Sequence, residues 1–276
     1  MDNKSSSGFN LFEDKSNSLT SISITKRYAV DCDGNYHDRD DICSVSMELG
    51  ILAKAVLQSK LVYFGYNNHY WKTSYYQQLD ETNSVLNTAK SWGGFNLTKF
   101  ISIQNHHSTA VAMLRDAINA STSTDSLIIC AAGPMQTIGQ AIAASDATKR
   151  RYVRVISHSN WNNEHAGRYG AGEGLSLPRY NLDTYNSSYS PNATFISNMG
   201  VKISKIRDQN YTVSAPYSSY SWLEVSADGR LRAMYSECHD VAAKSTFDCS
   251  DAGVIWYALK NDQNGSPAKL KAFFGQ

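Results

Sequence analysis

The feature that most constrains the fold of this chain is a regular alternation of short apolar runs with helix-periodic segments. The apolar runs predict strands at residues 27–31, 61–65, 101–103, 126–130, 152–156 and 201–206, and the periodic segments predict helices at 42–60, 80–92, 108–118, 135–144 and 252–260. Consecutive parallel strands need a crossover connection, which a helix usually supplies. The pattern therefore predicts an α/β fold with a mostly parallel, open, twisted sheet and helices on both faces.

The composition limits the class of protein. The chain has 276 residues, of which 42% are hydrophobic, and 26 Lys and Arg against 25 Asp and Glu, a formal net charge of +1. This apolar fraction excludes a disordered chain, and the near-zero charge argues against a nucleic-acid partner. No apolar run approaches the ~18 residues of a membrane span, so no membrane partner is expected. Residues 1–22 are rich in Ser, Asn and Lys and predict a disordered leader, while residues 23–276 predict a single domain.

The five cysteines do not suggest a disulfide framework, because their number is odd and none are closely spaced. Cys32, Cys43 and Cys130 lie in apolar segments and are predicted to be ordinary core residues. Whether Cys238 and Cys249 pair with each other is left open. The low charge and the many Ser, Asn and Tyr residues favour a secreted or periplasmic protein, with a cytoplasmic one as the alternative.

An acidic loop directly after the first predicted strand is the strongest sign of chemistry. It holds five aspartates and a single arginine within eleven residues. Like charges at that density repel one another unless a cation neutralises them, and carboxylate oxygens suit Ca²⁺ or Mg²⁺. Asp33 and Asp41 flank a strand-to-helix turn, where an open α/β sheet normally binds ligands, so they are predicted to bind the metal. Asp38 is expected to be satisfied locally by Arg39 and His37.

Other predicted strands also end in small or amide-bearing residues. The second strand is followed by Asn67 and Asn68, the strand at 126–130 by Ala131, Ala132 and Gly133, and the strand at 152–156 by Ser157 to Asn160, with Asn162, Asn163 and Glu164 just beyond. Parallel strands end at one edge of a sheet, where ligands collect. We therefore expect these residues to surround one site.

These motifs resemble the nucleoside hydrolase family, the calcium-dependent N-ribosyl hydrolases. The family opens with a strand and an Asp-x-Asp-Pro-Gly-x-Asp-Asp loop, and Asp31-Cys-Asp33 with Asp40-Asp41 is similar to its two ends. Three further motifs are similar: Gly65-Tyr-Asn67-Asn68 to a Gly-Asn pair that meets the sugar, Ala132 to Ile138 to a turn whose preceding carbonyl binds calcium, and Asp251 to Ala258 to an Asp that opens an apolar helix. The resemblance covers about Tyr28 to Asn261.

The resemblance implies an enzyme that cleaves a glycosidic bond in a small-molecule nucleoside or related sugar. It implies a Ca²⁺, with Mg²⁺ as the alternative, held by Asp33, Asp41, Asp251 and the carbonyl of Ala132. Asp33 would take a proton from a metal-activated water. Substrate contacts would come from Asp40, Asn67, Asn68 and His158, and from a sugar clamp formed either by Asn162, Asn163 and Glu164 or by Arg179 to Asn181. A homo-oligomer is left open.

The chain departs from the family at the C-terminal motif. Ser250 stands where the family usually has a His that protonates the leaving group. The acid would then be one of three other histidines: His158, His165 or His239. Asp240 is an alternative to Asp251 as the C-terminal metal ligand, although the segment after it makes a poorer apolar helix.

The acidic loop also departs from the family. Together with the missing His, the aromatic residues of the presumed rim leave the substrate open between a nucleoside and a saccharide. Six residues separate Asp33 from Asp40 where the family has three, so the acidic loop cannot adopt the family conformation throughout. Aromatic residues that either stack on the substrate or simply pack crowd the presumed rim: Tyr63, Tyr66, Tyr70, Trp71, Tyr75, Tyr76, Trp161, Tyr169 and Tyr180.

Two other functions compete with hydrolysis of a glycosidic bond. Asp31-Cys-Asp33-Gly34 also resembles the Asp-x-Asp-Gly signature of haloacid-dehalogenase-like phosphohydrolases, in which Asp31 would accept the phosphoryl group beside Mg²⁺. The missing His keeps open a non-catalytic, calcium-dependent saccharide-binding protein on the same scaffold.

Overall fold

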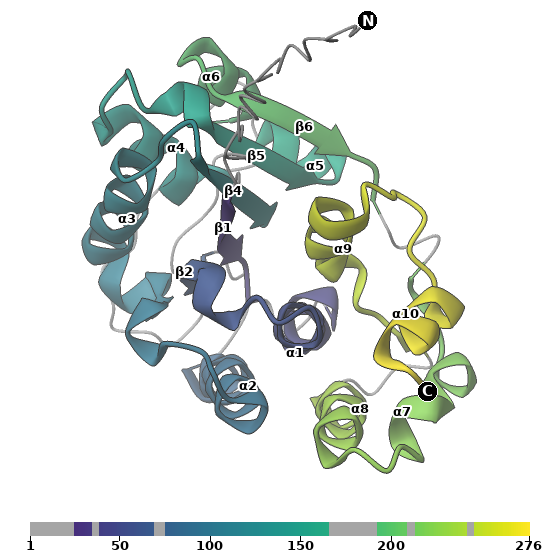
Figure 1. Cartoon of the computed structure of the whole chain (residues 1–276). Helices are drawn as coiled ribbons and strands as arrows, with labels where there is room; N and C mark the ends of the chain where they lie inside the picture. Colours follow the sequence, from purple (N-terminus) through teal and green to yellow (C-terminus); the bar gives the residue numbers. More distant parts are fainter. Residues whose placement is uncertain (1–24, 35–38, 69–74, 166–191, 209–212, 242–245) are drawn as a thin grey trace, which may run out of the picture.

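The computed structural model describes residues 25–34, 39–68, 75–165, 192–208, 213–241 and 246–276. Six strands form one parallel sheet: β1 (Thr25–Cys32), β2 (Leu61–Tyr66), β3 (Phe100–Ser102), β4 (Asp125–Ala132), β5 (Val153–His158) and β6 (Lys202–Ile206). Their order is β3-β2-β1-β4-β5-β6 (Figure 1). The predicted parallel α/β sheet is confirmed. Within the described ranges, no helix combines the length and the apolar character that crossing a membrane requires.

The sheet reverses its direction of growth between β1 and β4. From β1 the chain adds β2 and β3 on one side, and from β4 it adds β5 and β6 on the other. β1 and β4 pair along their whole length, with Asp31 opposite Ala131 and Cys32 opposite Ala132. In open α/β sheets such a reversal leaves a crevice at the carboxyl ends of the two strands. The loops that follow β1, β4 and β5 therefore start around this crevice.

Helices cover both faces of the sheet (Figure 1). On one face lie α1 (Arg39–Lys54), α2 (Tyr75–Trp92) and α9 (Gly253–Lys260), with α7 (Ser221–Glu224), α8 (Gly229–Val241) and α10 (Pro267–Phe274) beyond them; on the other lie α3 (Ile103–Asn119), α4 (Gln136–Ala144) and α6 (Ala193–Asn198). Side chains alternate along β1: Tyr28 and Val30 enter the first core, and Ala29 enters the second.

Helix α1 matters most for the site, because its first turn contains Asp40 and Asp41. Negative side chains there, and Lys54 in the last turn, complement the helix dipole. Its apolar stripe is buried as predicted, but the helix ends at Lys54, six residues before the predicted end. Val56 therefore lies beyond the helix and is 80% exposed.

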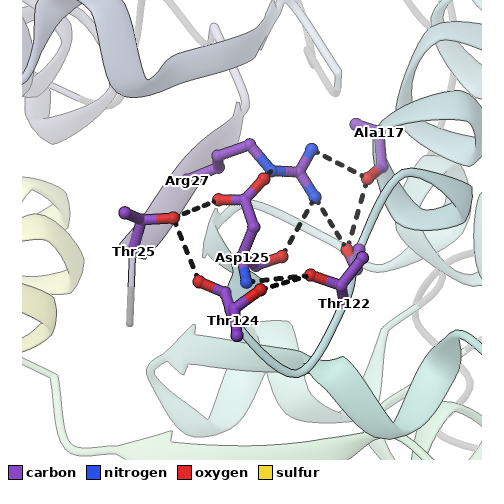
Figure 2. Close-up of polar contacts among 7 residues, drawn as sticks. Thr25, Arg27, Ala117, Thr122, Thr124 and Asp125 are labelled. Carbon is purple, nitrogen blue, oxygen red and sulfur yellow. Dashed lines mark hydrogen bonds and ion pairs between the residues drawn. The ribbon is translucent and has the colours of Figure 1, made fainter. Parts of the chain in front are cut away.

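A polar cluster holds together the amino ends of β1 and β4, opposite the crevice (Figure 2). Arg27 Nε lies 2.7 Å from Asp125 Oδ2, and the same guanidinium donates to the carbonyl of Ala117 on α3. Thr25 Oγ1 donates to Asp125 Oδ1 at 2.7 Å. These contacts fix the register of the two central strands.

The C-terminal region differs most from the sequence-based expectation. Helices α8 and α10 were not predicted, nor was the antiparallel pair β7 (Ala215–Pro216) and β8 (Thr246–Phe247). A disulfide joins Cys43 on α1 to Cys238 on α8, so the prediction that Cys43 is an unpaired core residue is wrong. Cys249 is free and buried and does not pair with Cys238. The sequence separation of 195 residues gave no hint of the bond, which follows from the packing of two helices.

Candidate metal centre

Three aspartates from separate parts of the chain converge at the crevice. Asp33 follows β1, Asp41 lies in the first turn of α1, and Asp251 lies in the short 3-10 turn before α9. One carboxylate oxygen from each lies within 4.8 Å of those of the other two, and all three residues are buried. Among the described residues, this is the group of three or more acidic, His or Cys side chains that lie closely enough to hold an ion.

The three aspartates line a pocket of about 180 Å³. The other lining residues are Asp40, His158, Ser159, Trp161, Asn162 and Asp208. The pocket thus draws on the ends of β1, β5 and β6 and on the start of α1. Ser159 belongs to the strand-end residues expected at the site, whereas Asp208 was not singled out in the sequence, although it follows a strand and satisfies the same rule.

The turn after β1 is held against the turn after β4. The Asp33 backbone N–H donates to the Ala132 carbonyl at 3.3 Å, and the Asn68 backbone N–H donates to the Cys32 carbonyl at 3.0 Å. A Cβ atom at Gly133 would lie 2.9 Å from the Asp33 nitrogen, so this approach requires a glycine. The Ala132 carbonyl therefore borders Asp33, and its second lone pair is compatible with the ligand role that the resemblance implies.

His158 is the histidine at the pocket. Its Nδ1 lies 2.6 Å from Asp251 Oδ1, and its Nε2 lies 3.6 Å from Asp208 Oδ1. Burial by itself lowers the pKa of His158, but the nearby carboxylates, Asp251 first among them, outweigh it and raise the pKa above its ordinary value. His158 therefore holds the Asp251 carboxylate in place.

The other two candidate histidines have different surroundings. His165 Nδ1 lies 2.6 Å from the Trp161 carbonyl, and the two rings stack with centroids 4.2 Å apart. His239 lies on α8, against the rings of Tyr217 and Tyr235. Neither residue lines the pocket.

The structure separates the two aspartates that the sequence offered at the C-terminal motif. Asp251, at the start of the apolar helix α9, joins Asp33 and Asp41, whereas Asp240 lies in α8 and its side chain is outside the described residues. Ser250 Oγ donates to Asp40 Oδ2 at 3.2 Å. The residue that replaces the family's His thus contacts a carboxylate of the acidic loop.

Asn67 and Asn68 lie under the pocket and do not line it. The Asn68 amide donates to Asp31 Oδ1 and to the Pro134 carbonyl, and the Tyr63 hydroxyl donates to Asp31 Oδ2 at 2.9 Å. Burial raises the pKa of Asp31 to about 8, against the opposing effect of these donors. The Asn67 amide donates at 3.4 Å to Ser102 Oγ, toward β3. In this structure both asparagines support the loops below the site.

The residues of the predicted sugar clamp differ in their burial and in whether they line the pocket. Asn162 and Asn163 are buried in α5 (Asn160–Glu164), and Asn162 lines the pocket, whereas Glu164 is exposed. Asn181 lies outside the described residues. Trp161 is 36% exposed and lines the pocket, whereas Tyr63 and Tyr66 are buried in the core. The remaining predicted rim aromatics lie in segments or side chains that the structure does not describe.

A wider pocket of about 550 Å³ adjoins the acidic one and shares part of its wall. Ser159, Trp161 and Asp208 line both, and Asn160 and Arg207 line the wider pocket alone. Arg207 is held by the Gln263 carbonyl and by Asn264 Oδ1. The two spaces together offer room for a molecule with two parts, one beside the acids and one beside Trp161.

The donor set fits a hard divalent cation. Three carboxylates and a neighbouring backbone carbonyl offer oxygen alone, which suits Ca²⁺ or Mg²⁺ and not the N/S sites that zinc prefers. Three like charges this close repel one another strongly, and a bound cation removes that cost. This concentration of three buried carboxylates is the observation that makes the site a candidate metal centre.

Comparison with known proteins identifies the fold. No family model matches the chain. It is 29% identical over 253 residues to uncharacterized protein P22 of Formosa agariphila, covering 87% of this chain and 85% of that protein. Its structure is similar to the inosine-uridine preferring nucleoside hydrolase of Bacillus anthracis (TM-score 0.53, 12% identity, 87% of this chain and 83% of that chain). It is also similar to an inosine-guanosine nucleoside hydrolase (TM-score 0.50, 8% identity, 86% and 80%). The chain has a nucleoside-hydrolase-like fold, as predicted.

Proposed function

We propose that this protein is a calcium-dependent hydrolase that cleaves the glycosidic bond of a nucleoside or a related sugar. The observation that carries the proposal is the convergence of Asp33, Asp41 and Asp251 in a pocket at the point where the sheet reverses. The structural neighbours described above are nucleoside hydrolases, which supports this class of reaction. The ion would be Ca²⁺ or, as the alternative, Mg²⁺.

The metal would be held by the three aspartates and the Ala132 carbonyl. When bound, such a cation lowers the pKa of a coordinated water toward neutrality. Asp33 would accept that proton as the general base. Asp40 and Asn162, which line the same pocket, would accept and donate hydrogen bonds to sugar hydroxyls. The concentrated negative charge would stabilise the oxocarbenium-like transition state.

The leaving group would occupy the adjoining pocket. Trp161 presents an aromatic surface there, because its other side is covered by the stacked His165 ring. A nucleobase or the apolar face of a second sugar would stack on that surface. The disulfide between Cys43 and Cys238 supports a secreted or periplasmic location, because such bonds persist in oxidising compartments.

A second function is favoured by a specific observation. Ser250, which replaces the expected leaving-group acid, donates to Asp40, so no proton donor stands at that position. This supports a calcium-dependent saccharide-binding protein without turnover. The phosphohydrolase alternative is weaker, because its nucleophile would be Asp31, which is fully buried and held by Tyr63 and Asn68.

The test is release of reducing sugar from a nucleoside panel and an oligosaccharide panel, with added Ca²⁺ and with chelator. We expect turnover that needs the metal and that Asp33→Ala abolishes. Asp116→Ala, which removes an exposed aspartate on α3, serves as the matched control and should keep full activity. Calcium-dependent binding of a sugar without turnover would replace the hydrolase by the binding protein, and phosphate release with Mg²⁺ would overturn both.

A further inference from the structure

Two glutamates outside the pocket are the most unusual polar groups of the described structure. Glu48 on α1 and Glu81 on α2 are both 0% exposed. Within the described ranges, none of their four carboxylate oxygens has a hydrogen-bond partner. Buried carboxylates are almost always paired or bound to a metal, because leaving one unpaired costs several kcal/mol. For two carboxylates, this cost is on the order of the stability of a whole domain.

The two side chains belong to one cluster. Helices α1 and α2 pack against each other. Burial raises the pKa of Glu81 well above its ordinary range, and Asp33 and Glu48 raise it further. Burial, followed by Asp251 and Asp33, does the same to the pKa of Glu48. Burial raises the pKa of the Cys32 thiol at the end of β1, and both glutamates raise it further.

No positive charge balances this cluster among the described residues that act on it. The charged groups that shift Glu48 and Glu81 most are all acidic. A pair of protonated acids would satisfy itself only by hydrogen bonds between the two groups or to a neighbouring acceptor, and none is formed here. A cation bound between the two carboxylates would satisfy both of them.

Two hydroxyls complete an oxygen donor set. Ser44 lies four residues before Glu48 on α1, and Ser84 lies three residues after Glu81 on α2, so each shares a helix face with its glutamate. Both serine residues are buried, and neither hydroxyl has a hydrogen-bond partner among the described residues. Hydroxyl and carboxylate oxygens are ligands that a hard cation uses.

We propose that Glu48 and Glu81, with the hydroxyls of Ser44 and Ser84, form a second site for a hard divalent cation between α1 and α2. The ion neutralises both carboxylates and links the two helices. Because Asp41 lies seven residues before Glu48 on the same face of α1, this ion also fixes the helix that carries one ligand of the first site. The second site does not depend on the proposed hydrolase activity.

The test counts ions on the full-length protein. The chain is stripped with a chelator, dialysed against Ca²⁺, and its bound metal is measured by mass spectrometry of the elements and by calorimetric titration. We expect two ions per chain for the wild type, and one ion for Glu48→Gln, Glu81→Gln or Asp251→Asn. Glu224→Gln, at an exposed glutamate on α7, should keep both.

The outcomes are distinguishable without an activity assay. One wild-type ion that both glutamine variants keep, or two ions retained in both glutamine variants, overturns the second site and leaves the glutamates as protonated acids. If the glutamine variants fail to fold, Ser44→Ala and Ser84→Ala replace them and should weaken one of the two sites about tenfold. Equal affinity for both ions in the serine variants overturns the proposal. Asp251→Asn changes a ligand of the first site, so loss of that ion alone tests the proposed function and leaves the second site unaffected.

Discussion

Two clusters of acidic side chains each have one member on helix α1, and the clusters differ in their access to solvent. Asp41 in the first turn borders a pocket, together with Asp33 and Asp251. Glu48, two turns further along, is sealed between helices with Glu81. A ligand can enter and leave the first group, whereas whatever satisfies the second is enclosed by the fold. The position of a carboxylate along one helix thus separates a site for exchange from a site for structure.

The two groups also differ in what holds them. The pocket aspartates come from the ends of secondary-structure elements at the sheet edge, where loops carry function and the scaffold stays fixed. The glutamates come from the middle of two helices, where any loss of packing is felt by the core. Substitutions in the first group should therefore change activity and spare stability, and changes around the second should do the opposite.

The largest effect is expected for Asp41→Asn. This change removes one of three clustered charges, so metal binding weakens and kcat/KM should fall by about 10³-fold. The free energy of unfolding of the metal-free protein should stay constant or rise by about 1 kcal/mol, because repulsion is relieved. Kinetics on the best nucleoside or sugar, and urea unfolding in chelator, measure the two. Asp116→Asn is the control, and a loss of stability with Asp41→Asn would break the comparison.

The disulfide tests the structural half of the comparison. Cys43 lies between Asp41 and Glu48 on α1 and is bonded to Cys238 on α8. Replacing both by alanine should cost about 3–5 kcal/mol of unfolding free energy, because the bond closes a long loop. Cys249→Ala, at a free buried cysteine, should cost about 1 kcal/mol and is the control. Under conditions in which the double variant remains folded, its kcat/KM should stay within about threefold of the wild-type value. A selective loss of activity would show that the pocket depends on this link.

The sheet could be predicted from sequence because its signal is local. Strands β1 to β6 fall at the short apolar runs of the sequence, each followed by a helix-periodic segment or a turn. The crossover rule then predicts that these strands lie parallel in one sheet. Helices α8 and α10 lack that signal, because they lie outside the first layer and bury only a few residues each, such as Leu231, Met234 and Leu270. The disulfide depends on how α8 meets α1, which no spacing reveals.

The candidate site could likewise be predicted only where its signal is local in the sequence. Asp33 and Asp41 are close in sequence and follow a strand, so charge density and topology mark them, whereas Asp251 was identified through the family resemblance. Asn67 and Asn68 also follow a strand, but the sequence does not show whether an amide faces the pocket or the core. Glu48 was overlooked, although its position three residues after Val45 and four before Leu52 places it on the buried face of α1.

The adjacent asparagines under the pocket offer a matched pair with a smaller effect. Asn68→Ala leaves Asp31 and the Pro134 carbonyl without their donor and should cost about 2 kcal/mol. Asn67→Ala loses only long hydrogen bonds, at 3.4 and 3.5 Å, but it places an alanine at a φ of 56°, so it should cost about 1 kcal/mol. Urea unfolding compares them. A large rise in KM with Asn67→Ala at unchanged stability would instead place its amide on the substrate, as the sequence suggested.

The smallest effect is expected for a carboxylate that is neither in the pocket nor sealed. Asp228 accepts from the Arg230 backbone N–H at 2.9 Å at the start of α8, and hydrogen bonds from the Arg230 side chain hold the pKa of Asp228 below its ordinary value. A lowered pKa stabilises the folded state above the ordinary pKa of about 3.9, and this contribution is lost as the pH falls through the folded pKa. Asp228→Ala should therefore cost about 1 kcal/mol at pH 7 and progressively less near pH 3, whereas Asp228→Asn, which keeps the cap, should cost about 0.3 kcal/mol. Urea unfolding at the two pH values measures this. A cost that grows toward acid would mean that Asp228 is held by something other than its charge. This half-buried carboxylate would then no longer serve as the reference for the two buried groups.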